Sequence, residues 1–254
     1  MGVETAKPLR TLYVFAHQDD EVDVAAKIVT DLRKGAEVHC VWVTDGSHGG
    51  PADLREKESR AVMKFLGVPE SNLRFLGFED QNAYRFLREI SRELIAVAEE
   101  LQPAEITSQA YEGGNIDHDA VSFVSTLAAK KVNAVHYEFP DSNIYQGRVR
   151  VFEFLPDGKT PTLYTRVDRE LYGIKMKTFK MYPTQATSLS SYELAMDGKS
   201  LKRLGEPYRL KPDYDYTQPP AAELRYAGTS KRTATLELWL AATRDFHAKY
   251  GSLE

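Results

Sequence analysis

Apolar residues in the first half of the chain alternate between short continuous runs and helical spacing. The runs predict buried strands at 11–16, 38–44, 73–76, 105–108 and 135–137. The segments between them predict amphipathic helices over 21–34, 54–66, 84–101 and 117–131, with Gly35 and Gly67 placed to end the first two. Strands that alternate with helices predict an α/β fold, a Rossmann-like, doubly wound and mostly parallel sheet with right-handed crossovers.

The pattern changes after about residue 140. Segments 149–154 and 162–167 flank Leu155-Pro156-Asp157-Gly158 and predict a hairpin. Helical spacing returns over 169–181 and 236–250. We therefore expect a single domain over 1–254, with a core at about 10–140 and C-terminal additions, a hairpin and helices, over about 141–254.

Composition narrows the class of protein. The chain is 42% hydrophobic and carries 33 basic against 37 acidic residues, a net charge of −4, with no tract of Lys and Arg. We therefore expect no nucleic-acid partner and no anionic membrane surface. Cys40 is the single cysteine, which excludes an internal disulfide and is typical of a reducing cytosol. With neither a signal peptide nor a run long enough to span a bilayer, a cytoplasmic protein is expected, and homo-oligomers remain open.

Two polar clusters follow predicted strands. His17-Gln18-Asp19-Asp20-Glu21 comes directly after the first strand, and Asn115-Ile116-Asp117-His118 comes after the fourth. In a doubly wound sheet both clusters lie at the same carboxyl edge. His17, Asp20 and His118 are then expected to converge as three metal ligands with one position open, the arrangement of a catalytic zinc site. Asp19 beside them is a candidate base.

These motifs resemble those of the LmbE-like, PIG-L-type N-acetylglucosaminyl deacetylases. Ala16 to Glu21 is similar to the family's Ala-His-Pro-Asp-Asp-Glu, with Gln18 in place of Pro, and Asn115 to His118 is similar to its His-Pro-Asp-His. Weaker similarities to family motifs lie at Val43–Gly46, Arg55–Glu58, Leu66–Val68, Phe75–Asp80 and Tyr182–Gln185. With them, the resemblance covers roughly residues 10 to 190.

The resemblance implies an activity and a set of roles. It implies zinc, or another divalent ion, bound by His17, Asp20 and His118, with Asp19 as general base. Bound zinc lowers the pKa of its water and polarises an amide carbonyl. The implied reaction removes an acetyl group from an N-acetylated amino sugar or small glycoside, a small-molecule substrate. Arg55 and Asp80 match family positions that contact the substrate's polar groups.

One residue departs from the family at a catalytic position. Asn115 stands where the family has the histidine associated with oxyanion stabilisation and proton donation. An asparagine amide donates a hydrogen bond but cannot titrate. Asn115 therefore stays a candidate catalytic residue, and two alternatives stay open. One is a catalytically weak or inactive relative that binds a metal and a sugar or metabolite. The other is a deacylase of a non-sugar amide in natural-product biosynthesis.

Three further residues have two interpretations each. Asp117 either aims the imidazole of His118 from behind the metal or caps the following helix. Glu21 either supports the site or places a favourable charge at a helix N-terminus. Arg55 either contacts substrate or forms a surface ion pair on a helix that also carries Glu56 and Glu58. Dinucleotide binding is disfavoured, because histidine and acids rather than glycines follow the first strand.

Overall fold

The computed structural model describes residues 8–195, 201, 205–220 and 235–251 and centres on a seven-stranded sheet. Its strand order is β3-β2-β1-β4-β5-β9-β8. Pairing is parallel from β3 to β5 and antiparallel for β9 and β8. In sheet order, the strands are β3 (Leu73–Phe78), β2 (Glu37–Thr44), β1 (Arg10–Phe15), β4 (Glu105–Gln109), β5 (Val135–Phe139), β9 (Glu206–Leu210) and β8 (Leu163–Thr165).

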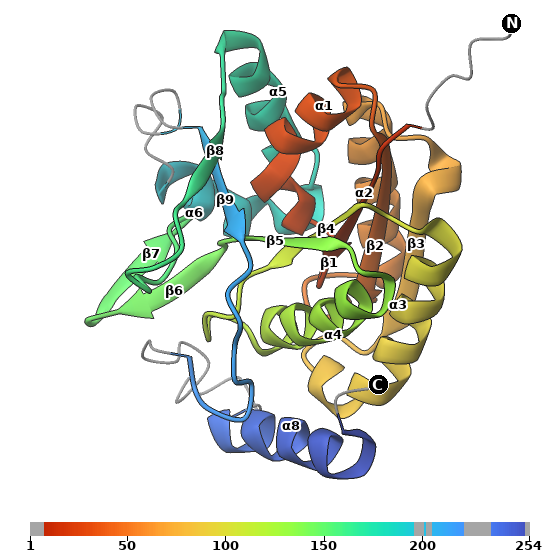
Figure 1. Cartoon of the computed structure of the whole chain (residues 1–254). Coiled ribbons are helices and arrows are strands. Elements are labelled where there is room, and N and C mark those ends of the chain that lie inside the picture. The colour runs from red at the N-terminus through yellow and green to blue at the C-terminus, as the bar shows by residue number, and fades with distance from the viewer. Residues whose placement is uncertain (1–7, 196–200, 202–204, 221–234, 252–254) are drawn as a thin grey trace, which may run out of the picture.

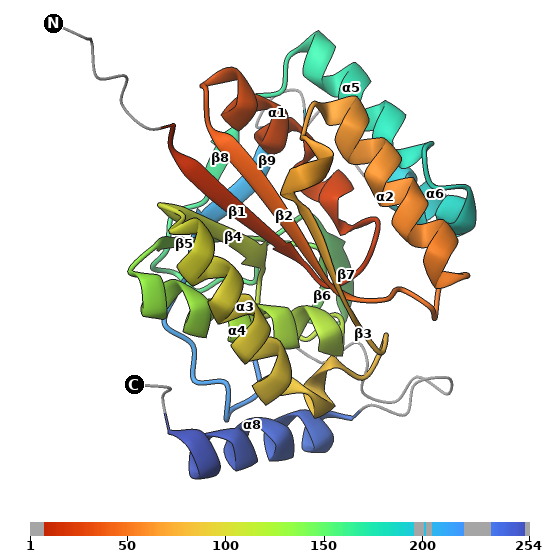
Figure 2. The same ribbon diagram turned by 90° about the vertical axis from the view of Figure 1, so that its right-hand side faces the viewer.

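Helices cover both faces of this sheet. One face packs against α1 (Ala25–Arg33), α2 (Ala52–Leu66) and α5 (Arg169–Phe179). The other packs against α3 (Leu87–Leu101) and α4 (Ile116–Val132), with α8 (Leu236–Tyr250) outside them (Figures 1 and 2). Strand β1 is buried on both sides, since its successive side chains enter the two apolar clusters in turn.

The first half of the chain follows the predicted elements closely. All five predicted strands are present, and Gly67 ends α2 with a left-handed φ of 97°. The predicted helix over 21–34 differs at its start, where a short 3-10 helix, η1 (Asp20–Val24), precedes α1. The remaining 3-10 turns are η2 (Glu70–Asn72), η3 (Ala83–Arg85) and η4 (Pro183–Gln185).

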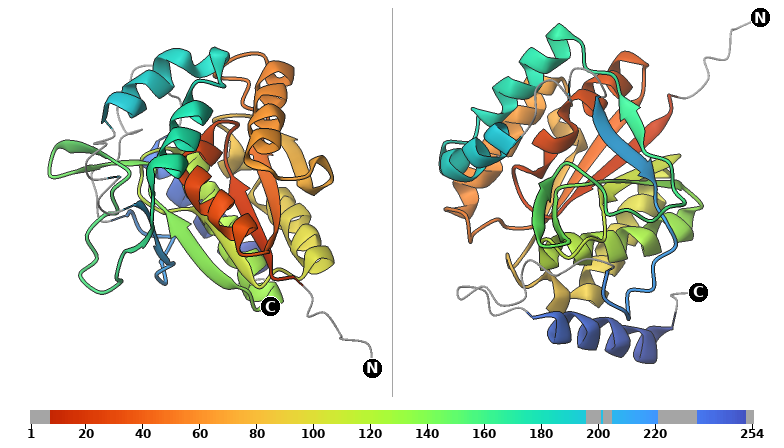
Figure 3. Two further views of the ribbon diagram at one scale, coloured as in Figure 1. Left: turned by 90° about the horizontal axis from the view of Figure 1, so that it is seen from above. Right: turned by 90° about the vertical axis from the view of Figure 1, so that its left-hand side faces the viewer.

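The predicted hairpin around Leu155–Gly158 is wrong. The hairpin instead joins β6 (Ser142–Tyr145) to β7 (Arg148–Val151), and β8 pairs with the distant β9. The turn residues Gln146 and Gly147 have φ values of 51° and 70°, the backbone that a two-residue hairpin requires. Strands β6 to β9 gather on one side of the molecule (Figures 1 and 3).

Among the α-helices that the structure describes after residue 165, two were predicted and one was not. The segments 169–181 and 236–250 are helical, as α5 and α8, while α6 (Ala186–Ala195) carried no clear periodic signal. None of the helices within the described ranges is both long and apolar enough to cross a bilayer. The single-domain organisation stays a prediction.

The strand order reverses between β1 and β4, and this positions the site. The chain leaves β1 toward α1 on one face and leaves β4 toward α4 on the opposite face. Because the two connections diverge, a crevice opens beyond the carboxyl ends of these strands, where doubly wound sheets bind ligands. His17 and His118 follow these two strands.

A buried ion pair ties the C-terminal half to the start of α1. Glu206 of β9 accepts hydrogen bonds from the amides of Ala26 and Lys27, at 2.9 and 2.7 Å, where the helix has no side-chain cap of its own. Lys175 of α5 donates to Glu206 at 2.7 Å and to two carbonyl oxygens that precede α1. Glu206 therefore holds both a helix terminus and a buried cation.

We expect Glu206→Ala to lower the free energy of unfolding by about 3–5 kcal/mol, because it leaves the Lys175 ammonium buried without its partner. Urea denaturation measures the change. The control is Asp245→Ala, which breaks an exposed pair with Lys249 and should leave the free energy of unfolding nearly unchanged. Equal effects of the two variants would contradict this role of Glu206.

Candidate metal centre and active site

His17, Asp20 and His118 lie together at the crevice, as the sequence predicted. Nδ1 of His17 is 3.2 Å from Nε2 of His118, which is 3.3 Å from Oδ1 of Asp20. The separation between His17 Nδ1 and Asp20 Oδ2 is 3.6 Å. Metal–ligand bonds near 2.0–2.1 Å in a tetrahedron place ligand atoms about 3.3–3.4 Å apart. All three side chains are buried, and their donor atoms fit one divalent ion.

The far nitrogen of each imidazole faces a carboxylate. Nε2 of His17 is 3.1 Å from Oδ2 of Asp117 and 3.3 Å from Oδ1 of Asp80. Nδ1 of His118 is 3.5 Å from Oδ2 of Asp141. When a carboxylate accepts a hydrogen bond from one nitrogen of a neutral imidazole, the proton stays on that nitrogen. The other nitrogen then carries the lone pair that can bind a metal. In the neutral form, each ring held in this way can offer its other nitrogen to a metal ion beside Asp20.

Asp117 supports an imidazole of the ligand group, as predicted, but a different imidazole from the one expected, and it does not cap the helix. It lies beside His17 rather than His118, and its oxygens accept the amides of Gln81 and Ala83, at 2.6 and 3.1 Å, in the loop after β3. The helix cap is Asn115, whose Oδ1 accepts the amide of Asp117 at 3.0 Å. The physical reason is that the neighbouring loop supplies two donors, which hold the Asp117 carboxylate away from the helix end.

A second group, His17 with Asp80 and Asp117, also brings ligand atoms close together. Its oxygens are already engaged, because Asp117 accepts two amides and Oδ2 of Asp80 accepts the amide of His48 at 2.9 Å. Oδ2 of Asp20 accepts hydrogen bonds from the His17 amide and from the Gln109 side chain. Oδ1 of Asp20 faces His118 and accepts neither of these bonds. The group that contains Asp20 therefore fits a metal better.

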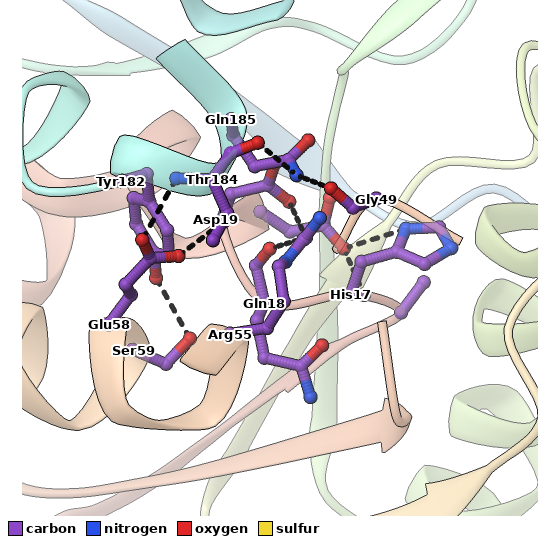
Figure 4. Close-up of polar contacts among 12 residues, drawn as sticks. His17, Gln18, Asp19, Gly49, Arg55, Glu58, Ser59, Tyr182, Thr184 and Gln185 are labelled. Atoms are coloured by element: carbon purple, nitrogen blue, oxygen red, sulfur yellow. Dashed lines mark hydrogen bonds and ion pairs between the residues drawn. The ribbon is translucent and has the colours of Figure 1, made fainter. Parts of the chain in front are cut away.

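Asp19 lies on the wall of the same cavity in an unusual backbone conformation. Its φ is 116°, and its amide donates to Oε2 of Glu21 at 3.1 Å. The guanidinium of Arg55 lies 3.1 Å from Oδ1 of Asp19 and also donates to the carbonyl of Gln18 (Figure 4). Burial raises the pKa of Asp19 to about 8, although Arg55 acts in the opposite direction. A carboxylate with a raised pKa suits a general base.

Arg55 is 2% exposed, so the surface ion pair considered for it is wrong. Its helix faces the interior of the molecule at this point, and its partners are Asp19 and Gln18 rather than its neighbours on α2. Of the two substrate-binding candidates, Arg55 lies against Asp19 and Asp80 lies against His17, and both line the cavity.

Glu21 is fully buried behind the cavity. It accepts hydrogen bonds from Nε1 of Trp42 at 3.1 Å and from the hydroxyl of Tyr182, which in turn bonds Ser59 at 2.8 Å. Because Glu21 also accepts the Asp19 amide, it connects the loop after β1 to the C-terminal half of the chain.

The segment after Tyr182 is attached to the rim in the same way. Glu58 accepts both the amide, at 3.0 Å, and the hydroxyl of Thr184. Gln185 donates to the carbonyl of Gly49 at 2.7 Å (Figure 4). The short motifs at 55–58 and 182–185 are thus bonded to each other, which the sequence alone did not indicate.

The cavity has a volume of about 480 Å³. Asp117 and Glu21 lie behind its wall. The other seven predicted residues line it: His17, Asp19, Asp20, Arg55, Asp80, Asn115 and His118. The sequence analysis missed the wall residues Asp23, Asp141 and Tyr192. Asp23 lies three residues after Asp20, but no motif marks Asp141 or Tyr192.

Comparisons with known proteins find similarity in sequence over part of the chain and similarity in fold over most of it. A model of the PIG-L family, described as GlcNAc-PI de-N-acetylase, matches residues 12–129. No curated protein sequence matches the chain. The zinc-inhibited form of a teicoplanin deacetylase is 17% identical with a TM-score of 0.67, covering 81% of this chain and 100% of that chain.

Two other solved structures are similar. N,N′-diacetylchitobiose deacetylase from Pyrococcus horikoshii is 19% identical with a TM-score of 0.58, covering 81% of this chain and 85% of that chain. The 4-carboxy-2-hydroxymuconate hydratase from Pseudomonas putida is 16% identical with a TM-score of 0.58, covering 84% of this chain and all of that one. The predicted α/β fold is confirmed, and the hydratase shows that this fold also supports a different reaction.

We expect His118→Ala to abolish stoichiometric binding of a divalent ion, because it removes one of three ligands. Elemental analysis after dialysis against Zn²⁺ measures the metal content. His48→Ala is the matched control, since His48 lines the same cavity but is not part of the ligand group. Full metal content in the His118 variant would contradict the assignment.

Proposed function

We propose that the protein is a zinc-dependent hydrolase that removes an acetyl group from an N-acetylated amino sugar or small glycoside. Residues 12–129 match a model of the PIG-L family, which supports this proposal. The family match supports the broader class, a metal-dependent N-deacetylase. The observation that carries the proposal is the convergence of His17, Asp20 and His118 donor atoms at one edge of a polar cavity. Zinc, the acetyl group and the sugar are the proposed details.

The chemistry is divided between the ion and the side chains. A divalent ion held by these ligands would lower the pKa of a water molecule and would polarise the amide carbonyl. Asp19 would take a proton from the water as its oxygen attacks the carbonyl carbon, and Arg55 keeps the carboxylate of Asp19 oriented. Because Asn115 cannot titrate, Asp19 also delivers the proton to the amine as the C–N bond breaks. The products are acetate and a free amine.

Asn115 contributes a hydrogen bond to the reaction and transfers no proton. Its Oδ1 is engaged in capping α4, so its NH₂ group is the part that serves the cavity. Placed there, the amide donates to the carbonyl oxygen as negative charge develops on it. The fixed cap bond keeps this donor in one orientation.

A second candidate function follows from the same residue. A relative that binds a metal and a sugar without turnover is favoured by the absence of a titratable group at position 115. A third, deacylation of a non-sugar amide, uses the same side chains. A cytoplasmic location and the absence of a nucleic-acid partner stay predictions.

We expect the purified protein to release acetate from N-acetylglucosamine-type compounds and to lose this activity on chelation. Asp19→Asn should abolish turnover yet retain the metal, because the base is removed and the ligands remain. Acetate is measured by an enzyme-coupled assay, and metal content by elemental analysis. Affinity for the sugar without turnover would favour the binding relative, and turnover of non-sugar amides alone would favour the third candidate.

Variants of Asn115 separate two roles of this side chain, the capping of α4 by its oxygen and hydrogen-bond donation by its NH₂ group. Asn115→Asp retains a good N-cap acceptor but removes the NH₂ group, so we expect unchanged thermal stability and a fall in kcat of about 10²–10³. Asn115→Ser retains both a cap and a hydroxyl donor, and its kcat should fall less. Equal activity of the Asp variant and the parent would show that Asn115 has a structural role alone.

A further inference from the structure

Asp23 carries a buried carboxyl group on the wall of the catalytic cavity. It lies in η1, three residues after Asp20, and is 7% exposed. Among the residues that the structure describes, none donates a hydrogen bond to its carboxyl oxygens, and none forms an ion pair with them within 4.0 Å. Buried carboxylates normally have such partners, because an unpaired buried charge is strongly unfavourable. The missing partner points to a ligand.

The cations near Asp23 are already engaged. Lys175 lies close enough for its charge to act on Asp23, but its ammonium donates to two backbone carbonyl oxygens and to Glu206, at 2.7–2.8 Å. An ammonium has three N–H donors, so none is left for the carboxyl group of Asp23. Arg55, the one Lys or Arg among the described lining residues of the cavity, pairs with Asp19. The described residues therefore leave the cavity itself as the source of a donor.

Charge favours an ammonium over a hydroxyl as that donor. Burial, and then repulsion from Asp141, raise the pKa of Asp23 well above its ordinary value, and Asp20 and Asp19 act in the same direction. A hydroxyl would supply a hydrogen bond and leave the negative charge in place, whereas an ammonium supplies both a hydrogen bond and the opposite charge. Asp23 belongs to neither of the described groups whose atoms lie close enough to hold a metal ion.

The cavity has room for more than the group that reacts. Its volume of about 480 Å³ is that of a site for an entire small molecule. Five aspartates line it. A divalent ion beside Asp20 would offset part of this charge, and Arg55 offsets that of Asp19. Asp23 has no such counter-charge among the described residues.

We propose that Asp23 binds an ammonium group at a non-reacting position of the substrate, so that the substrate is an N-acylated compound that carries a second, free amine. The inference rests on the proposed function for the acetamide that reacts. Such a substrate is a diamine acylated on one nitrogen, and hydrolysis gives acetate and a product with two free amines.

The first experiment compares kcat/KM within two pairs of N-acetylglucosamine derivatives that differ in charge. One pair is the 6-amino-6-deoxy derivative and N-acetylglucosamine itself, and the other is the 2-aminoethyl glycoside and the propyl glycoside. Both pairs are included because an ammonium at either end of the ring can face Asp23. We expect the ammonium member of at least one pair to be favoured about 10–100-fold, the range that a hydrogen bond to a charged partner implies. Equal values within both pairs would overturn the inference.

Asp23→Asn is the diagnostic variant, because it keeps the size of the side chain and removes its charge. We expect it to lower the preference for the ammonium member about tenfold. Glu153→Gln is the matched control: it also removes one negative charge, but Glu153 is exposed, pairs with Arg150 and lies outside the lining of the catalytic cavity. This control should keep the full preference. A preference that Asp23→Asn leaves intact would overturn the assignment to Asp23.

Binding without chemistry separates this inference from the proposed function. The zinc-loaded protein is titrated calorimetrically with 6-amino-6-deoxyglucose and 2-aminoethyl glucoside, which lack the acetamide, and with their uncharged counterparts glucose and propyl glucoside. Tighter binding of an ammonium ligand, weakened by Asp23→Asn and not by Glu153→Gln, would support the inference even if no compound releases acetate. Equal affinities within both pairs, or no detectable binding of either ammonium ligand, would overturn it.

Discussion

Negative charge concentrated at the carboxyl edge of the sheet is the constraint on which this site depends. Asp19, Asp20, Asp23, Asp80 and Asp141 line one cavity, and like charges this close oppose one another's ionisation. Backbone amides and ring nitrogens offset part of this repulsion, as at Asp80. The ligand atoms around Asp20 remain turned toward a common point. The fold thus gathers carboxyl groups and two imidazoles around one point where a cation would offset their charge, which supports the metal-dependent chemistry proposed above.

The sheet topology brings these charges together, and the C-terminal half of the chain holds them in place. Reversal of strand order between β1 and β4 sets His17 opposite His118. The loop between β1 and α1 then receives support from far along the chain: Tyr182 bonds Glu21, and Glu206 caps α1. The additions beyond residue 140 therefore support the catalytic loop as well as extend the surface of the cavity.

The sequence predicted what depends on local pattern. The strands from 10 to 139 follow from continuous apolar runs, and the ligand group follows from placing two polar clusters at strand ends. Contacts that depend on distant loops were missed or mistaken. Asp117 took its partners from the loop after β3, and Asp141 reached His118 from a segment with no periodic signal. The hairpin was misplaced because Gln146-Gly147 is a weaker turn signal than Pro156-Asp157-Gly158, although its backbone is the one that turns.

The strained backbone of Asp19 shows how the proposed base is oriented before substrate arrives. A left-handed non-glycine residue costs about 1–3 kcal/mol and persists only where its surroundings hold it. Here Glu21 accepts the amide of Asp19, and Arg55 binds its carboxylate. Gly46 and Gly49 complete the arrangement, because a Cβ at the first would collide with Gln18 and at the second with Arg55. These glycines allow the Gln18 and Arg55 side chains to pack closely beside Asp19, and Arg55 in turn holds the Asp19 carboxylate at the cavity wall.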